Sequence, residues 1–311
     1  MLAQFADIFV QMVVLFAVGA TGYVAKRAHL MDEDFDKKFS KLMLSTALPA
    51  LMLASVLDAD TLPTAAQLGW TIVVSCASYV VLVVGGFALT AALRVPDGRK
   101  GVFRFMMMFG NTGFIGFPVT EAVFGTEALI YATVFNLVFN VLVFSLGVWL
   151  LATDNKYGVK VRMGPKSLLS PCIVASMAAI VLAFLGLHSV PVVGEALGTL
   201  GSLTTPAAML IIGSSLANVP VRQLVGGPRL VAASLVRLLV APALVWAALH
   251  LVVSDHMLLG VVVVLSAMPV AANGTMICHQ YGGDAKTMAQ GTFVTTLGAL
   301  VTIPLMAALF A

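Results

Sequence analysis

Residues 110–118 read GNTGFIGFP and lie in the middle of the apolar stretch VFRFMMMFGNTGFIGFPVTEAVFG, residues 102–125. Three glycines, one asparagine and one proline fall within these nine residues. A glycine weakens a helix by about 1 kcal/mol and an interior proline costs about 3 kcal/mol. We therefore predict that a helix is broken here, at the place where the surrounding residues are most apolar.

The composition indicates that the surrounding solvent is a lipid bilayer. Of 311 residues, 60% are hydrophobic and 10% are charged, whereas about 25% of a soluble domain is charged. Hydropathy separates ten apolar segments, each long enough to cross about 30 Å of hydrocarbon as a helix. We expect an all-α membrane protein, because the alternation typical of a membrane β-barrel is absent. The first segment is predicted to be a retained helix, since its positive charges follow the apolar run. The ten segments are 5–25, 39–57, 67–93, 101–124, 127–152, 167–187, 194–217, 229–253, 257–280 and 285–310.

The charges predict the orientation of these segments. All seventeen Lys and Arg residues lie in the connections that follow odd-numbered segments or just inside the segments that begin there. The connections after segments two, four, six and eight carry only acidic charges: Asp58, Asp60, Glu195 and Asp255. By the positive-inside rule the odd connections are cytoplasmic and both termini lie outside the inner membrane. The net charge of +3 thus reports membrane topology and gives no reason to expect a nucleic-acid partner.

The two halves of the chain repeat one another. TALPALML at 46–53 matches LTTPAAML at 203–210, and GTEA at 125–128 matches GGDA at 282–285, both with an offset of 157 residues. We predict a first five-helix repeat over 1–152, a cytoplasmic linker over 153–166 and a second repeat over 167–311. Because five is odd, the second repeat is inverted, as in many secondary transporters.

A second interrupted span lies at the matching position. Residues 266–283 read SAMPVAANGTMICHQYGG, in which Pro269 and Gly274 interrupt the ninth segment. Half-helices that begin at such breaks present free N–H groups and a partial positive charge, which suit an anion. The alternative is that the glycines and prolines are packing kinks only. The predicted substrate-binding residues are Asn111, Thr112, Gly113, Gly116, Pro118, Asn136, Asn140, Pro269, Asn273, Gly274 and Thr275.

Other polar residues within the segments have two interpretations each. Asn136 and Asn140 are four residues apart, hence on one helix face, and either contact substrate or bond a neighbouring helix. Glu121, Arg237 and His279 are candidates for coupling. The alternatives are that Glu121 and His279 lie at the rims and that Arg237 snorkels to the cytoplasmic side.

Threonines and cysteines in the apolar segments favour structural roles. Thr292, Thr295 and Thr296 are expected to bond the carbonyl four residues earlier. Cys76, Cys172 and Cys278 are spaced like neither a metal site nor a disulfide pair, and we expect them to be buried apolar side chains.

These motifs together resemble the auxin efflux carrier family, whose bacterial members include malonate and malate permeases. The resemblance covers essentially the whole chain and rests on GNTGFIGFP, TALPALML, MPVAANG at 268–274 and RLLVAP at 237–242. It implies ten helices in a 5+5 inverted repeat, similar in fold to bile-acid sodium symporters and sodium/proton antiporters. Helices 1, 2, 6 and 7 would form a scaffold, which also implies a homodimer. Helices 3–5 and 8–10 would form the transport domain, with 4 and 9 broken and crossing.

The sequence therefore predicts a secondary carrier for small organic anions, in particular carboxylates, that works by alternating access with H⁺ or Na⁺ as a possible coupling ion. The alternatives are a channel or receptor for organic anions, or a sodium-coupled symporter of the bile-acid type. We do not expect an enzyme, a cofactor or a metal site, because HExxH, GxSxG and paired catalytic aspartates are absent from the spans.

Overall fold

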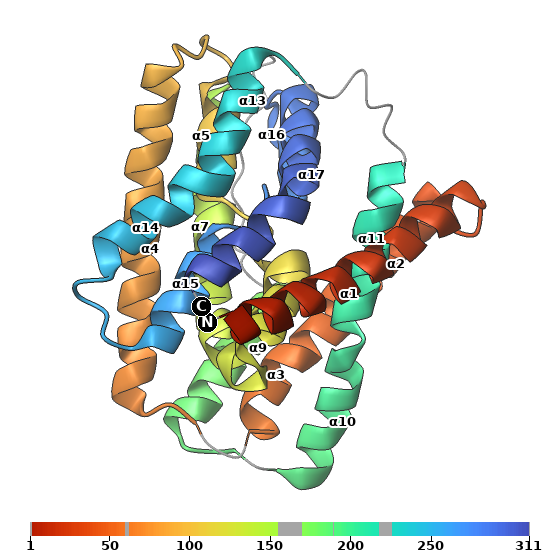
Figure 1. Cartoon of the computed structure of the whole chain (residues 1–311), viewed down its shortest axis with the longest axis vertical. Helices are drawn as coiled ribbons and strands as arrows, with labels where there is room; N and C mark the ends of the chain where they lie inside the picture. The colour runs from red at the N-terminus through yellow and green to blue at the C-terminus, as the bar shows by residue number, and fades with distance from the viewer. Residues whose placement is uncertain (1, 60–61, 155–169, 189, 218–225, 311) are drawn as a thin grey trace.

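The computed structural model describes residues 2–59, 62–154, 170–188, 190–217 and 226–310, and for some residues within the helices it describes the backbone only. This part of the chain is helical and contains no β-strand beyond one isolated bridge. The helices form a single bundle in which most axes run along the long direction of the molecule (Figure 1). The elements are α1 (Leu2–Arg27), α2 (Glu33–Leu42), η1 (Met43–Ala47), α3 (Leu48–Leu57), α4 (Ala65–Ala92), α5 (Lys100–Met108), η2 (Thr112–Gly116), α6 (Phe117–Phe124), η3 (Thr126–Ala128), α7 (Leu129–Leu142), η4 (Val143–Gly147), α8 (Val148–Thr153), α9 (Pro171–Phe184), α10 (Pro191–Ser202), α11 (Thr204–Ala217), α13 (Pro228–Leu235), η6 (Val236–Val240), α14 (Ala241–Leu249), α15 (His256–Ser266), α16 (Asn273–Tyr281) and α17 (Ala285–Phe310).

Several of these helices are long and apolar enough to cross a membrane. Six stretches in the described part of the chain meet that condition, and three shorter apolar helices accompany them. The chain is therefore a multi-pass membrane protein. Large apolar side chains such as Val80, Val84 and Val192 point outward, as expected for helices that face lipid. Cys76 is also exposed, so the expectation that all three cysteines are buried is wrong for this residue.

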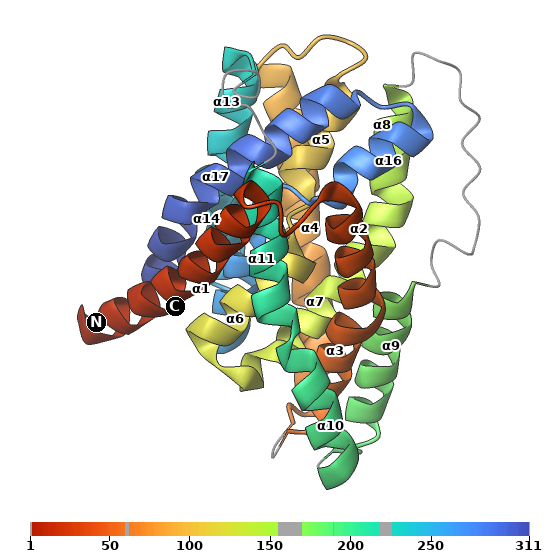
Figure 2. The same cartoon turned by 90° about the vertical axis from the view of Figure 1, so that its right-hand side faces the viewer.

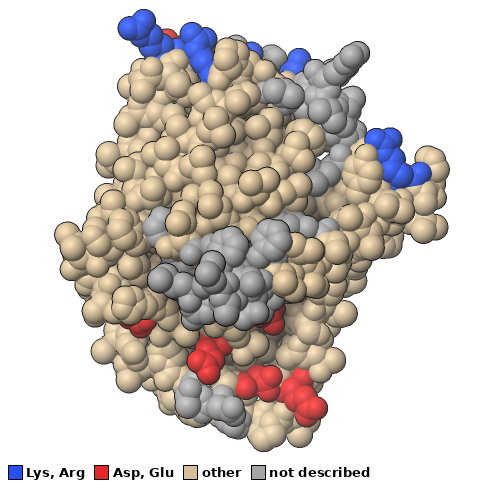
Figure 3. Space-filling view, viewed as in Figure 1, with Lys and Arg blue, Asp and Glu red and all other residues tan. Residues whose placement is uncertain are grey.

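Charged side chains lie at the two ends of the bundle. Figure 3 shows Lys and Arg at the upper end and at the corner formed by α1 and α2, whereas Asp and Glu are most visible near the lower end. The band between them is almost free of charge on this face. An uncharged band between two charged ends is the surface that a bilayer requires.

Glycines allow α1 and α11 to cross with their backbones in contact. A Cβ atom on Gly22 would meet the backbone of Leu210, and one on Gly213 would meet the backbone of Gly19. In the neighbouring pair of helices, a Cβ atom on Gly201 of α10 would likewise meet the backbone of Leu51 in α3. Small residues permit such approaches in membrane helices. Helices α1, α3, α9, α10 and α11 thus form one side of the bundle (Figure 2).

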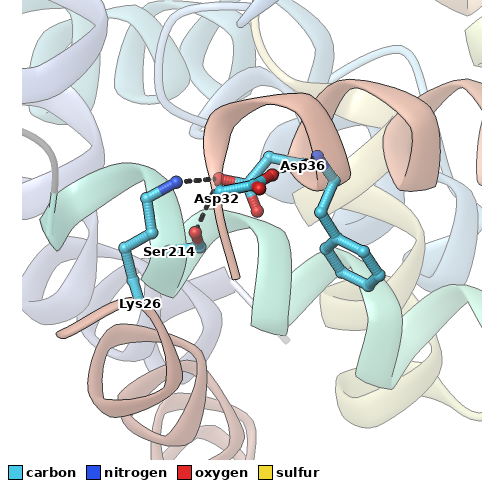
Figure 4. Close-up of polar contacts among 5 residues, drawn as sticks. Lys26, Asp32, Asp36 and Ser214 are labelled. Carbon is cyan, nitrogen blue, oxygen red and sulfur yellow. Dashed lines mark hydrogen bonds and ion pairs between the residues drawn. The ribbon is translucent and has the colours of Figure 1, made fainter. Parts of the chain in front are cut away.

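An ion pair links α1 to α2 at one end of this side of the bundle. Lys26 of α1 donates to Asp36 Oδ2 of α2 at 2.7 Å, and Ser214 Oγ of α11 donates to the same oxygen at 2.7 Å (Figure 4). Both side chains of the ion pair are nearly buried, and removing one partner would leave an uncompensated charge. The cluster therefore ties α1, α2 and α11 together.

Three prolines in this fold follow wide helical turns. The π-helical turns η1, η2 and η6 are followed, two residues after each ends, by Pro49, Pro118 and Pro242. A proline ring clashes with the carbonyl four residues earlier in an α-helix, and a π-turn displaces that carbonyl. The helix therefore continues past each proline. The predicted break of the helix at GNTGFIGFP is present but short, because only residues 109–111 leave the helix.

Candidate functional site

The two interrupted segments meet inside the bundle. Helix α5 ends at Met108 and η2 begins at Thr112, while α15 ends at Ser266 and α16 begins at Asn273. Gly110 and Val270 form an antiparallel bridge, the N–H of Asn111 donates to Pro269 O at 2.7 Å, and that of Ala271 donates to Phe109 O at 3.0 Å. Each break thus satisfies backbone groups of the other, which makes unwound backbone tolerable at membrane depth.

A threonine of α17 completes this pairing. The N–H of Val270 donates to Thr295 Oγ1 at 3.1 Å, and that hydroxyl donates to Gly291 O at 2.7 Å. Thr296 likewise donates to Thr292 O at 2.7 Å. The expected bonds to carbonyls four residues earlier are therefore confirmed for these two threonines. The expectation is wrong for Thr292, whose buried hydroxyl has no partner among the described residues. The acceptor role of Thr295 toward the break has no signal in the sequence, since Val270 is 25 residues away.

A small cavity lies where the second half-helices begin. Its volume is about 100 Å³. Six of the residues predicted from sequence to bind substrate lie in its wall, beside apolar side chains from η1, α3, α7 and α9. The lining residues are Leu44, Leu48, Asn111, Thr112, Gly113, Phe114, Asn136, Phe139, Asn140, Cys172, Ala271, Ala272 and Asn273.

The polar side chains of the first half are partly engaged with one another. Asn111 Oδ1 accepts from the N–H of Phe114 at 3.1 Å and so caps η2. Thr112 Oγ1 donates to Asn136 Oδ1 at 2.9 Å, and Asn140 Nδ2 donates to Asn136 O at 2.8 Å. Within the described residues the NH₂ groups of Asn111 and Asn136 have no hydrogen-bond acceptor, which leaves them available to a bound anion.

Asn273 in the second half lacks such partners. Its Oδ1 atom is buried and has no hydrogen-bond partner among the described residues. No side chain caps the N-terminus of α16, which Asn273 begins. The amide oxygen and nitrogen of asparagine occupy equivalent positions, so a half-turn of this amide places two donors at the same point. In that turned orientation the amide suits a ligand that accepts hydrogen bonds.

The remaining predicted residues do not line the cavity. A Cβ atom on Gly116 would meet Leu265 Cδ2 at 2.7 Å, and one on Gly274 would meet Phe105 Cε1 at 2.8 Å, so both glycines allow close packing. Pro118 is buried within α6, and Pro269 contributes its carbonyl to the pairing of the breaks. Thr275 lies in α16, half-buried and outside the lining of the cavity.

Arg237 of η6 is not part of the cavity lining and bonds backbone at the inner ends of α5 and α15. Its side chain is 1% exposed, and Nε and Nη2 donate to Met268 O at 3.1 and 2.9 Å while Nη1 donates to Met107 O at 2.9 Å. The interpretation that Arg237 snorkels to the cytoplasmic side is therefore wrong. Gly110 has to lack a side chain, because a Cβ atom there would meet Arg237 Nη2.

The other two coupling candidates lie away from the cavity or outside the described residues. Glu121 in α6 is half-buried and accepts from Thr205 Oγ1 of α11 at 3.2 Å, which joins the two sides of the bundle. The side chain of His279 is not among the described residues.

Comparison with known sequences identifies a family and several relatives. A family model described as "membrane transport protein" matches residues 7–166 and 161–307. An uncharacterized transporter of Methanocaldococcus jannaschii is 27% identical, over 95% of this chain and 96% of the relative. An uncharacterized transporter of Methanothermobacter thermautotrophicus is 23% identical over 91% and 92%. The uncharacterized transporter YfdV of Escherichia coli K12 is also 23% identical, over 91% of both chains.

Proposed function

This chain belongs to the membrane transport protein family, and on that premise we propose that it is a secondary carrier for small organic anions, in particular carboxylates. The observation that carries the proposal is the cavity at the crossing. Two half-helices begin at its wall, at Thr112 and Asn273, and asparagine amides surround it. Helix N-termini and amide donors bind anions, and the described lining contains no carboxylate that would oppose one.

The size of the cavity supports a short substrate. Pockets that take drug-sized ligands are about 300–1,000 Å³, whereas this one is about 100 Å³. In this conformation it suits an anion of a few heavy atoms better than an aromatic carboxylate. Phe114, Phe139 and Leu48 supply apolar contacts for the carbon skeleton.

The position of the cavity between two groups of helices supports alternating access as the mechanism. Leu48 and Cys172 belong to the side formed by α1, α3, α9, α10 and α11, and Leu44 belongs to η1, which leads into α3. The asparagines belong to α7 and the crossing. Relative movement of these groups would open the cavity to one face of the membrane and then to the other. We propose the α1-containing group as the scaffold and the remainder as the transport domain.

We further propose ten spans in a 5+5 inverted repeat, with halves 1–152 and 167–311 joined by a cytoplasmic linker. The meeting of one break from each half supports this arrangement. The segregation of Lys and Arg supports cytoplasmic odd-numbered connections, extracytoplasmic termini and location in the inner membrane. A homodimer through the scaffold belongs to the same proposal.

Counterflow in proteoliposomes tests the carrier mechanism. Vesicles preloaded with unlabelled malonate should accumulate labelled malonate transiently, because a carrier exchanges across the membrane without net flux. A channel equilibrates the label without overshoot, and that result would refute the carrier. Imposed pH or Na⁺ gradients then test coupling: stimulation by one gradient identifies its ion, and indifference to both identifies a uniporter.

Cysteine accessibility tests the orientation. In a variant without the three native cysteines, a cysteine at Asp58 or Asp255 should react with an impermeant thiol reagent added outside the cell. A cysteine within 156–162 should react only after the membrane is opened. The reverse pattern would overturn the orientation while leaving the proposed substrate untouched.

A further inference from the structure

The two helices that run into the crossing have charged partners at both ends. At the start of α5, Asp154 Oδ2 accepts from the N–H of Val102 at 2.9 Å. At the start of α15, Asp255 Oδ1 accepts from the N–H of Leu258 at 3.0 Å. At their inner ends both helices meet the same guanidinium, that of Arg237, through Met107 O and Met268 O. Carboxylates at N-termini and a cation at C-termini oppose the helix dipoles.

The two helices that leave the crossing have no charged partner at their inner ends among the described residues. The neutral amide of Asn111 caps η2, and no side chain caps α16. Within the described residues, the cavity at these N-termini is lined by amides, one threonine hydroxyl, a cysteine thiol and apolar groups. The buried, unpartnered Oδ1 of Asn273 lies at the same place.

The partial charges of the helix ends show which end of the crossing lacks a compensating charge. Each helix terminus carries about half an elementary charge. The two inner C-termini therefore sum to about one negative charge, which the single guanidinium of Arg237 offsets. The two inner N-termini sum to about one positive charge, which no described side chain of the cavity offsets. One carboxylate would complete the balance.

We infer that Arg237 is a positioning residue that sets the sign of the site: it holds and neutralises the negative helix ends, so that a ligand in the cavity experiences only the positive ones. This inference rests on the proposed function. It assigns Arg237 no contact with substrate, because its three bonded nitrogens face backbone carbonyls and it is not part of the cavity lining.

The experiment compares Arg237→Gln and Arg237→Lys in detergent-purified protein. The dissociation constant for malonate is measured by calorimetry at fixed ionic strength, beside the melting temperature without ligand and the counterflow rate in proteoliposomes. Arg104→Gln is the matched control. Arg104 lies on α5, one of the two helices that Arg237 bonds, but its guanidinium lies over the ring of Phe87, 4.0 Å from the centroid, and its Nε donates to Thr90 Oγ1 at 3.3 Å.

We expect Arg237→Gln to weaken malonate binding about tenfold, which corresponds to about 1.4 kcal/mol. Arg237→Lys should restore most of the affinity, because the charge is retained. Its melting temperature and its counterflow rate should still be lower than those of the wild type, because the lysine ammonium lacks the planar guanidinium geometry that bonds both carbonyls. Arg104→Gln should bind malonate as the wild type does. Wild-type affinity in Arg237→Gln, or equal losses in the Gln and Lys variants, would overturn the inference.

A second variant keeps the inference testable if Arg237→Gln does not fold. Asn273→Asp places a carboxylate where the positive helix ends meet. If the field there is positive, this variant should melt at a higher temperature without ligand and should lose malonate binding. A lower melting temperature would overturn the assigned sign. Failure of the wild type to bind any short carboxylate would instead refute the proposed function, and the melting result would still report the sign of the site.

Discussion

The two interrupted segments differ in how far their own residues supply hydrogen-bond partners for the groups that the interruption leaves free. The first leaves the helix for residues 109–111 only, and its next helix is capped by Asn111. The second is irregular over residues 267–272, its next helix has no side-chain cap, and Asn273 has an unpartnered buried atom. Their backbones are nevertheless paired with each other. The difference teaches that Asn111 serves both the fold and a ligand, because its Oδ1 caps the next helix and its NH₂ group is left over, whereas the amide of Asn273 serves no described part of the fold.

Truncation of Asn273 should have the largest effect on binding and almost none on folding. A hydrogen bond to a charged group contributes about 1.5–3 kcal/mol, so Asn273→Ala should weaken malonate binding by about ten- to a hundredfold. Because the variant removes an unpartnered buried group, its melting temperature without ligand should stay level or rise. Calorimetry and thermal unfolding measure the two quantities. Unchanged affinity would remove the distinction between the segments.

Truncation of Asn111 should affect stability and binding together. Loss of an N-cap costs about 0.5–2 kcal/mol, so Asn111→Ala should unfold at a lower temperature and also bind malonate less tightly. Asn111→Asp keeps the capping oxygen and should recover the stability. It should not recover the affinity, because its charge repels an anion. Recovery of both would show that Asn111 acts on the ligand only through the fold.

Removal of the Thr112 hydroxyl should have an intermediate effect. Thr112→Val breaks the bond to Asn136 Oδ1 and should cost about 1 kcal/mol in stability, with a loss in malonate affinity of a few-fold. Thr120→Val is the control, because the buried hydroxyl of Thr120 has no partner in the described part of the chain. The control should unfold at the wild-type temperature or above it. Equal destabilisation in both variants would assign the effect to side-chain shape.

Substitution of Pro118 should have the smallest effect. The helix already continues from η2 through α6 past this proline, which is absent from the cavity lining. Pro118→Ala should therefore change the malonate dissociation constant by less than about threefold, that is, by less than about 0.7 kcal/mol. A titration of the purified variant checks this. A loss as large as that of Asn273→Ala would mean that the π-turn itself shapes the cavity.

The amino-acid sequence by itself determined the membrane class, the positions of the two interruptions and the kinds of side chain around the cavity. These properties follow from composition and from propensities that act within a few residues, such as glycine and proline inside an apolar run. Asn111, Thr112, Asn136, Asn140 and Asn273 are predictable for this reason, since polar groups in apolar spans need a common interior.

The tertiary structure alone decided how the orphaned backbone groups are satisfied. Arg237 reaches carbonyls 31 and 130 residues away, and Thr295 reaches an N–H 25 residues away. It also decided that Gly116 and Gly274 serve packing, because their close neighbours, Leu265 and Phe105, belong to other helices. A buried donor takes whichever acceptor the packed helices bring within about 3 Å, and local sequence does not encode which one that is.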